Sequence, residues 1–242
     1  GNYWMDHPYH PVAEGILFKK KFDEYLANND LSNNIDTNCN YSFYFSPNQN
    51  DIQNLNLLNS SVNIGINKPK SFDEDNSKLK QIKCLAPRLI RERLFSENKF
   101  DHYEFKINIL SAQNPSFENR IELDKEKDPN GIPIPNLYWK RSEKVRSSSR
   151  IIVENFAKFL IEENLGRLAA EDFLFSNKKY LHQNGYHHMG GTRMGDDINN
   201  SVVNKDLKVH NIKNLFVSGS SVFTTAGHAY PTLTITQLSL RL

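Results

Sequence analysis

Apolar and polar residues alternate along several short stretches of the chain, and these stretches predict strands. The clearest alternation covers residues 102–113, "HYEFKINILSAQ", as expected for a strand with one buried face. The run "YSFYF" at 41–45 also predicts a strand, because aromatic side chains suit a half-buried pleated surface. Turn residues followed by apolar runs predict two more strands, one within 114–123 and one after the Pro-Asn-Gly turn at 129–131.

A longer pattern with helical spacing follows these strands. Ser142 is a suitable N-cap for a helix that begins near Glu143. Four apolar side chains then fall on one face of that helix: Ile152, Phe156, Phe159 and Leu160. Strand-turn-strand units that precede a long amphipathic helix predict an antiparallel sheet backed by helices, an α+β arrangement.

The N-terminal third of the chain is less clearly patterned. The apolar stretch at 15–22, "GILFKKKF", is compatible with either a strand or a helix. Residues 28–80 are rich in Asn and Ser and indicate loops between short elements. Residues 79–98 have a helical pattern with a break at Pro87. No internal repeat is evident.

Composition narrows the class of protein. The chain has 242 residues, of which 38% are hydrophobic, so it can form one large or two modest packed domains. Its formal net charge of +2 gives no reason to expect a nucleic-acid partner. No apolar run approaches the roughly 20 residues that a membrane span requires, and the N-terminus lacks the features of a signal peptide. We therefore expect no nucleic-acid partner and no membrane span in this chain.

Cysteines and chain ends add two weaker expectations. Cys39 and Cys84 form neither a disulfide framework nor a metal-binding pattern, so a reducing, cytoplasmic compartment is the default, although the sequence does not identify the compartment. The chain starts without Met in a segment typical of a protein interior. It ends on "ITQLSLRL", a helical pattern without a C-cap glycine. We therefore expect this chain to be the C-terminal part of a longer protein.

The stretch "YHHMGGTRMG" at 186–195 contains the first candidate chemistry. His187 and His188 are adjacent, so on an extended segment only one of them can face a given site. A neutral histidine held beside a ligand can accept a proton near neutral pH. Three glycines allow the backbone to run close to a ligand or to another strand: Gly190, Gly191 and Gly195. The alternative is a glycine-rich loop with purely structural histidines.

A metal site is not expected. A zinc ion could be bound by His182, His187 and His188, but their spacing fits no common site and no cysteine supports it.

The last 30 residues suggest a second binding feature. A strand over "NLFVSG", 214–219, would end in a Gly-Ser-Ser turn whose backbone N–H groups can face an anion or a carbonyl. Pro231 suits the first position of a helix, which would make Tyr230 its N-cap. Tyrosine is a poor N-cap, so the first N–H groups of this helix remain available for water or for a ligand carbonyl.

Taken together, these segments resemble one family. The order "HHMGGTRMG", "VVNKDLKVHNIKNLFVSGSSVF" and "HAYPTLTITQLSLRL" is similar to the C-terminal signature of the glucose–methanol–choline (GMC) flavin oxidoreductases. "GNYWMDHP" at the start resembles the family's entry into its substrate domain, and "SAQNPSFENRIEL" resembles one of its sheet segments. The resemblance is most specific over 186–242.

The resemblance implies an enzyme with two parts. Residues 1–20 would connect from an FAD domain, 21–180 would form an antiparallel-sheet substrate domain, and 181–242 would return to the dinucleotide-type FAD domain. No G-x-G-x-x-G occurs in this chain, so most ADP contacts would lie in a missing N-terminal half. The substrate would be a small alcohol, with a sugar or polyol as the first expectation, while the electron acceptor stays undefined.

Roles for individual residues follow from the resemblance. His187 matches the active-site histidine, which would take the hydroxyl proton while the substrate carbon passes hydride to flavin N5. Gly219 and Ser220 match the turn that lies along the FAD. Three residues at the start of the last helix would face the flavin N1–C2=O edge: Tyr230, Pro231 and Thr232.

One position departs from the family pattern. The second catalytic residue is usually Asn or His immediately before the Pro of "NPTLT", and here that residue is Tyr230. Its hydroxyl could hold a substrate oxygen, His228 could take over the role, or the activity could be altered or lost. The alternative function is therefore a non-catalytic GMC-fold relative that acts as a binding or scaffold protein.

Overall fold

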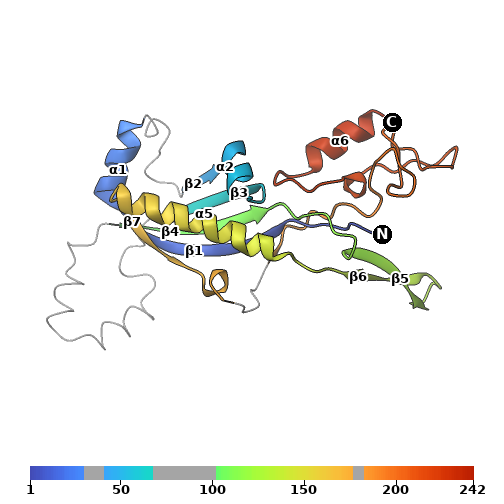
Figure 1. The fold of residues 1–242 in the computed structure, drawn as a ribbon, viewed down its shortest axis with the longest axis horizontal. Coiled ribbons are helices and arrows are strands. Elements are labelled where there is room, and N and C mark those ends of the chain that lie inside the picture. The colour runs from blue at the N-terminus through green and yellow to red at the C-terminus, as the bar shows by residue number, and fades with distance from the viewer. Residues whose placement is uncertain (30–40, 68–101, 177–182) are drawn as a thin grey trace.

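The protein is described here from a computed structural model, over residues 1–29, 41–67, 102–176 and 183–242 (Figure 1). One sheet organises most of it, with strand order β2–β3–β4–β1–β7, and β8 pairs with the start of β1. All of its paired strands are antiparallel. The strands are β1 Pro8–Phe18, β2 Tyr41–Phe45, β3 Ser60–Asn67, β4 His102–Ser111, β7 Gly166–Ala170 and β8 Gln183–Asn184.

A separate hairpin and a set of helices complete the described fold. The hairpin consists of β5 Arg120–Lys127 and β6 Pro133–Tyr138. The helices are α1 Lys19–Asn28, α2 Gln49–Asn54, α5 Glu143–Glu162 and α6 Thr232–Leu240, with single 3₁₀ turns at η1 Asp172–Leu174 and η2 Ser220–Val222. The predicted α+β arrangement with an antiparallel sheet is confirmed. Of the four predicted strands, two correspond to β2 and β4 of this sheet and two to the hairpin strands β5 and β6.

Helix α5 covers one face of the sheet (Figure 1). It begins where the sequence predicts, because the Ser142 side chain accepts a hydrogen bond from the Lys144 N–H. Ile152 and Leu160 are buried against Ile107 of β4 and its neighbours in the main hydrophobic core. Side chains alternate along a strand, so the residues between the core positions of β3 and β4 point to the opposite face.

That opposite face is polar where it meets the C-terminal segment. Residues 186–242 gather at the end of the sheet that is remote from α1 (Figure 1). They contain a small core of their own, formed by Val203, Leu207 and Val222 with partly buried neighbours. In the described part of the chain, no helix has the length and apolar character needed to cross a membrane.

Three local predictions need correction or comment. The stretch 15–22 contains both candidate elements, since β1 ends at Phe18 and α1 begins at the next residue. The predicted strand at 214–219 is wrong: among the described residues this stretch forms one isolated bridge, between Phe216 and Lys208, because the segment 207–209 that faces it is too short to extend a ladder. Helix α6 begins at Thr232, one residue later than predicted, with Pro231 at the cap position.

Some predicted features lie outside the described residues. They are the helix at 79–98 with Pro87, both cysteines (Cys39 and Cys84), and His182.

Candidate active site

The site forms where the N-terminal segment meets the histidine stretch. Met5 and Met189 exchange two backbone hydrogen bonds, each 2.8 Å long. Beside them, Gly190 has a φ of +74°, and a Cβ at this position would lie 2.1 Å from the Tyr3 carbonyl oxygen. Glycine is therefore required by both conformation and space. This confirms the predicted close approach, although the neighbour at Gly190 is the N-terminal backbone.

Asp6 joins the histidine segment to the start of β1 through hydrogen bonds. Its carboxylate is fully buried, and Oδ1 accepts hydrogen bonds from the His7 N–H at 2.7 Å and from the His187 N–H at 2.9 Å. Because one oxygen holds two segments that are far apart in sequence, it sets the position of the His187 backbone relative to β1. Charge-assisted hydrogen bonds of this kind are stronger than neutral ones.

His187 and His188 have different surroundings, as their adjacency predicts. The His187 ring lines a cavity, and its Nδ1 lies 3.0 Å from Nδ1 of His7. Nε2 of His187 makes no hydrogen bond within the described part of the chain. The His188 side chain is 61% exposed and its ring packs against Trp4, with 5.2 Å between centroids. His187 is thus the histidine placed to act on a molecule in the cavity.

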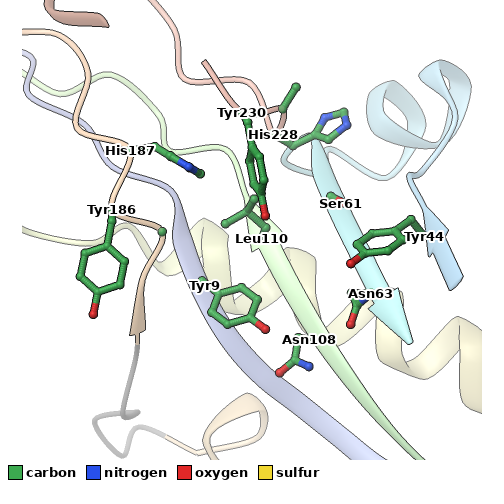
Figure 2. Close-up of a pocket in the computed structure, with 12 residues that line it drawn as sticks. Tyr9, Tyr44, Ser61, Asn63, Asn108, Leu110, Tyr186, His187, His228 and Tyr230 are labelled. Atoms are coloured by element: carbon green, nitrogen blue, oxygen red, sulfur yellow. The ribbon is translucent and has the colours of Figure 1, made fainter. Parts of the chain in front are cut away.

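The cavity has a volume of about 620 Å³, and four adjacent strands provide its floor (Figure 2). Asn63 of β3 and Asn108 of β4 are register partners on this floor. Its lining is dominated by tyrosines and by polar side chains: Tyr9, Tyr44, Ser61, Asn63, Asn108, Leu110, Gly185, Tyr186, His187, His228, Ala229 and Tyr230. A cavity with this lining can accept several hydroxyl groups of one small molecule.

Tyr230 and His228 lie at the same cavity as His187 (Figure 2). The centroids of the Tyr230 and His187 rings are 4.6 Å apart, and the ring planes make an angle of 51°. Tyr230 is 71% exposed. His228 Nε2 lies 3.3 Å from the Ser46 hydroxyl, while its Nδ1 is buried without a hydrogen-bond partner among the described residues. The structure therefore brings the three predicted catalytic side chains together.

Two residues on the cavity floor have properties that matter for binding: Asn63 has an amide N–H without a partner among the described residues, and Tyr9 has a raised pKa. Nδ2 of Asn63 is buried and has no partner among the residues that the structure describes. Burial raises the pKa of the Tyr9 phenol, and the neighbouring Tyr230 and Tyr44 raise it further. Tyr9 therefore stays neutral at physiological pH, where its hydroxyl can donate a hydrogen bond.

The predicted cofactor residues border this site. Gly219 has a φ of +138°, which favours glycine, and a Cβ there would meet no atom within 4 Å. The next residue is tied to the histidine segment, because the Ser220 hydroxyl donates to the His188 carbonyl at 2.6 Å and its own carbonyl accepts from the Gly190 N–H. The Ser220 hydroxyl is thus occupied within the protein, whereas the space beside Gly219 is open.

The start of α6 is the second candidate contact for a cofactor. No side chain caps this helix, and its first backbone bond runs from the Ile235 N–H to the Pro231 carbonyl. Pro231 is buried, whereas Tyr230 and Thr232 are exposed. Uncapped N–H groups at a helix start suit an electron-rich carbonyl edge, which is the chemistry of the flavin N1–C2=O region. With the open space at Gly219, these features fit a flavin.

Several site residues could not be assigned from the sequence. They are Asp6, His7, Tyr9, Asn63 and Asn108. Asp6 and His7 stand in the quoted "GNYWMDHP", but nothing in that segment indicates that they contact residue 187. The described residues contain no group of three or more His, Cys, Asp or Glu side chains that could hold a metal ion.

The geometry defines a cavity lined by tyrosines, asparagines and histidines, with the His187 ring at its edge, and the comparisons with known proteins supply the family. The sequence profile described as GMC oxidoreductase matches residues 115–239, just over half of the chain. The chain belongs to the GMC oxidoreductase family.

Its curated relatives are oxidoreductases. The chain is 35% identical to the fructose dehydrogenase large subunit of Gluconobacter japonicus over 128 residues, which are 52% of this chain and 22% of that protein. It is 29% identical to 2-methyl-1,2-propanediol dehydrogenase of Mycolicibacterium austroafricanum over 150 residues, which are 62% of this chain and 26% of that protein. It is 26% identical to paromamine 6'-oxidase of Streptomyces fradiae over 141 residues, which are 58% of this chain and 25% of that protein. The chain therefore spans about a quarter of the length of these relatives.

Among solved structures, the chain is similar to a variant of formate oxidase from Aspergillus oryzae RIB40, studied for the modification of its FAD. The TM-score is 0.48 at 17% identity, over 100% of this chain and 46% of that one.

Proposed function

We propose that this chain forms the substrate cavity and part of the cofactor contact surface of an FAD-dependent oxidoreductase that acts on a CH–OH group. The observation that carries the proposal is His187, whose ring lines the cavity and whose Nε2 has no hydrogen-bond partner among the described residues. The relatives named as dehydrogenases and oxidases of sugars and alcohols support it. The remainder of such an enzyme corresponds to the part of the relatives that this chain does not match.

In this proposal His187 is the base. Oxidation of an alcohol to a carbonyl compound removes the hydroxyl proton and a hydride from the carbon. Nε2 of His187 receives the proton, which raises the electron density that expels the hydride. The flavin, when bound, supplies the two-electron acceptor. A positioned base of this kind contributes about 10²–10⁴-fold to the rate.

Tyr230 is the proposed second contact to the reacting oxygen. It borders the cavity beside His187, and its hydroxyl can donate to or accept from a substrate oxygen. His228 is the alternative residue for this role, because it lines the same cavity and its Nδ1 lacks a partner in the described part of the chain. A tyrosine hydroxyl serves here as a hydrogen-bond donor or acceptor, so the base remains His187 in either case.

The proposed substrate is a sugar, a polyol or a related alcohol. Asn63 and Asn108 stand opposite each other on neighbouring strands, with the hydroxyls of Ser61 and Tyr9 on the same floor. Amides and hydroxyls both donate and accept hydrogen bonds, so together they can pair with several hydroxyl groups of one ligand. Nδ2 of Asn63, which lacks a partner in the part of the chain that the structure describes, is a donor that such a ligand would satisfy.

The proposed flavin contacts are the open turn at Gly219 and Ser220 and the helix start at Tyr230, Pro231 and Thr232. The N–H groups at the start of α6 would stabilise negative charge at the flavin carbonyl edge. We also propose the division expected from the sequence, in which the sheet with α5 is the substrate part and residues 181–242 belong to the FAD part. This division differs from the expected bounds at one point: β1, Pro8–Phe18, lies within the expected connecting segment 1–20 but pairs with β4 and β7, so we place it in the substrate part.

The test uses the full-length protein that contains this chain. It should be yellow, and anaerobic mixing with a panel of sugars, polyols and simple alcohols should bleach the flavin absorbance with at least one of them. His187→Ala should slow that bleaching about 10²–10⁴-fold. His188→Gln is the matched control, because His188 neighbours the base but does not line the cavity, and it should bleach at close to the wild-type rate.

Each failure has a distinct meaning. A colourless protein contradicts the assignment of FAD. A yellow protein that no alcohol bleaches favours the non-catalytic binding or scaffold relative. Equal bleaching rates for His187→Ala and wild type would show that His187 is not the base.

A further inference from the structure

A second histidine lies directly behind the proposed base. His7 is fully buried and is not among the residues that line the cavity. Its Nδ1 lies 3.0 Å from Nδ1 of His187, and its Nε2 lies 3.1 Å from the Ala226 carbonyl oxygen. The two rings meet edge to face, with centroids 5.1 Å apart. His7 therefore does not meet a molecule in the cavity directly, and the cavity residue that it touches is His187.

The Ala226 carbonyl determines which ring nitrogens of His7 and His187 carry hydrogen. A carbonyl oxygen only accepts, so Nε2 of His7 must carry a hydrogen. In a neutral imidazole the other nitrogen then has no hydrogen, and Nδ1 of His7 is an acceptor. The hydrogen of the Nδ1–Nδ1 contact must therefore belong to His187. A neutral His187 with hydrogen on Nδ1 has a lone pair on Nε2.

The surroundings of His7 keep it neutral. Burial lowers its pKa, the Ala226 carbonyl opposes this effect, and the positive charge that His187 can carry lowers the pKa again. Asp6 acts in the opposite direction and His228 in the same direction, with smaller effects. A protonated His7 would donate from Nδ1 and force the hydrogen of His187 onto Nε2, where the lone pair is needed.

We propose that His7 is a positioning residue that holds His187 in its Nδ1–H tautomer, so that Nε2 faces the cavity as an unprotonated base. The use of that base rests on the function proposed above, whereas the tautomer itself does not. The geometry is held in place by Asp6 Oδ1, which accepts from the backbone N–H groups of both histidines. His7 thus has a role that no motif around residue 187 reveals.

Two substitutions at His7 distinguish an effect on the His187 tautomer from an effect on side-chain packing. His7→Asn places an amide oxygen close to the former Nδ1, so an acceptor for the His187 Nδ1–H remains. His7→Phe keeps a planar ring but removes that acceptor and leaves the Nδ1–H facing an apolar group. A buried donor without an acceptor is unfavourable, so the Nδ1–H tautomer of His187 should become about 10- to 100-fold less populated relative to Nε2–H.

The first experiment measures the tautomer directly. Long-range ¹H–¹⁵N correlation spectra of the histidine rings, recorded at about pH 8 where an ordinary histidine is neutral, distinguish Nδ1–H from Nε2–H. The His187 signal is assigned by its loss in His187→Ala. We expect Nδ1–H in the wild type and in His7→Asn, and a shift to Nε2–H in His7→Phe. A wild-type His187 in the Nε2–H form overturns the proposal even if neither variant folds.

The second experiment follows flavin bleaching in the full-length protein. His7→Phe should lower the limiting bleaching rate about 10- to 100-fold with a small change in substrate affinity, whereas His7→Asn should stay within about threefold of wild type. Equal losses for both variants would overturn the positioning role. If no alcohol bleaches the wild type, the proposed function fails, but the ring spectra still decide the tautomer.

Discussion

Replacing Gly190 by alanine tests how the histidine segment is held against the N-terminus. Two effects add in this substitution. A non-glycine residue with positive φ costs roughly 1–2 kcal/mol. In addition, the new Cβ would lie 2.1 Å from the Tyr3 carbonyl oxygen, so the two backbones must separate. Separation would weaken the two Met5–Met189 hydrogen bonds, each worth about 1 kcal/mol. We expect Gly190→Ala to lower the free energy of unfolding by about 3–4 kcal/mol.

Gly131→Ala is the matched control for this substitution. Gly131 has a similar φ of +80°, but a Cβ there would meet no atom within 4 Å, so only the conformational cost of about 1–2 kcal/mol applies. Urea unfolding can be followed by the fluorescence of Trp4 and Trp139, whose rings lie 5.1 Å apart close to the Gly190 segment. With an m value of about 2 kcal/mol per molar urea, the midpoints should fall by roughly 1.5–2 M for Gly190→Ala and by 0.5–1 M for Gly131→Ala. Equal midpoints would refute the contact with Tyr3.

Three further predictions concern single side chains. Tyr230→Phe keeps the ring beside His187 but removes the hydroxyl, so kcat/KM for the best alcohol should fall about 2- to 10-fold; an unchanged value would assign the second contact to another residue. Asn63→Leu should raise KM for a sugar more than for a simple alcohol, and equal changes would remove Asn63 from substrate recognition. Burial lowers the pKa of His10 to about 4, so the unfolded chain binds more protons between pH 4 and about 6.5. Stability should therefore fall by about 3 kcal/mol as pH drops through that window, and His10→Gln should flatten the loss in urea titrations.

Two strands of the main sheet, β2 and β4, were predictable because each carries a local signal, whereas β3 and β7 lie in stretches for which no strand was predicted. Core positions along β4, including Phe105 and Ile107, alternate with polar or partly exposed ones, and this pattern follows from the pleat alone. The N-cap at Ser142 is equally local, since it depends on one hydroxyl and the first turn of α5. Features that depend only on near neighbours in sequence can be recognised from one sequence.

The predicted strand at 214–219 failed for the complementary reason. Apolar residues such as Leu215 and Phe216 have strand propensity, but a strand also needs a partner to receive its hydrogen bonds. Among the described residues, the segment 207–209 lies beside this stretch and makes one bridge, Lys208 to Phe216, and two backbone hydrogen bonds, from the Val209 N–H to the Leu215 carbonyl and from the Val217 N–H to the Leu207 carbonyl. Propensity does not specify whether such a partner is available.

In the candidate site too, contacts between residues far apart in the sequence could not be predicted. His187, His228 and Tyr230 were found because they stand in one C-terminal segment whose motif order resembles a family. His7 was not found, because it lies 180 residues from His187 and is brought to it by the pairing of Met5 with Met189 and by the shared hydrogen bonds of Asp6. No spacing rule within a segment can detect a contact of that kind.

Burial, which the structure shows and the sequence does not, marks the missing residues. Asp6 and His7 stand directly before β1, between the buried Met5 and the start of the strand, and both are fully buried. A polar side chain at a buried position must find a hydrogen-bond partner, so a polar pair at the entrance to a central strand predicts a distant partner. Here that partner is the segment carrying the proposed base. Buried polar residues beside a core strand are therefore a better guide to the supporting residues of this site than the motif that contains His187 itself.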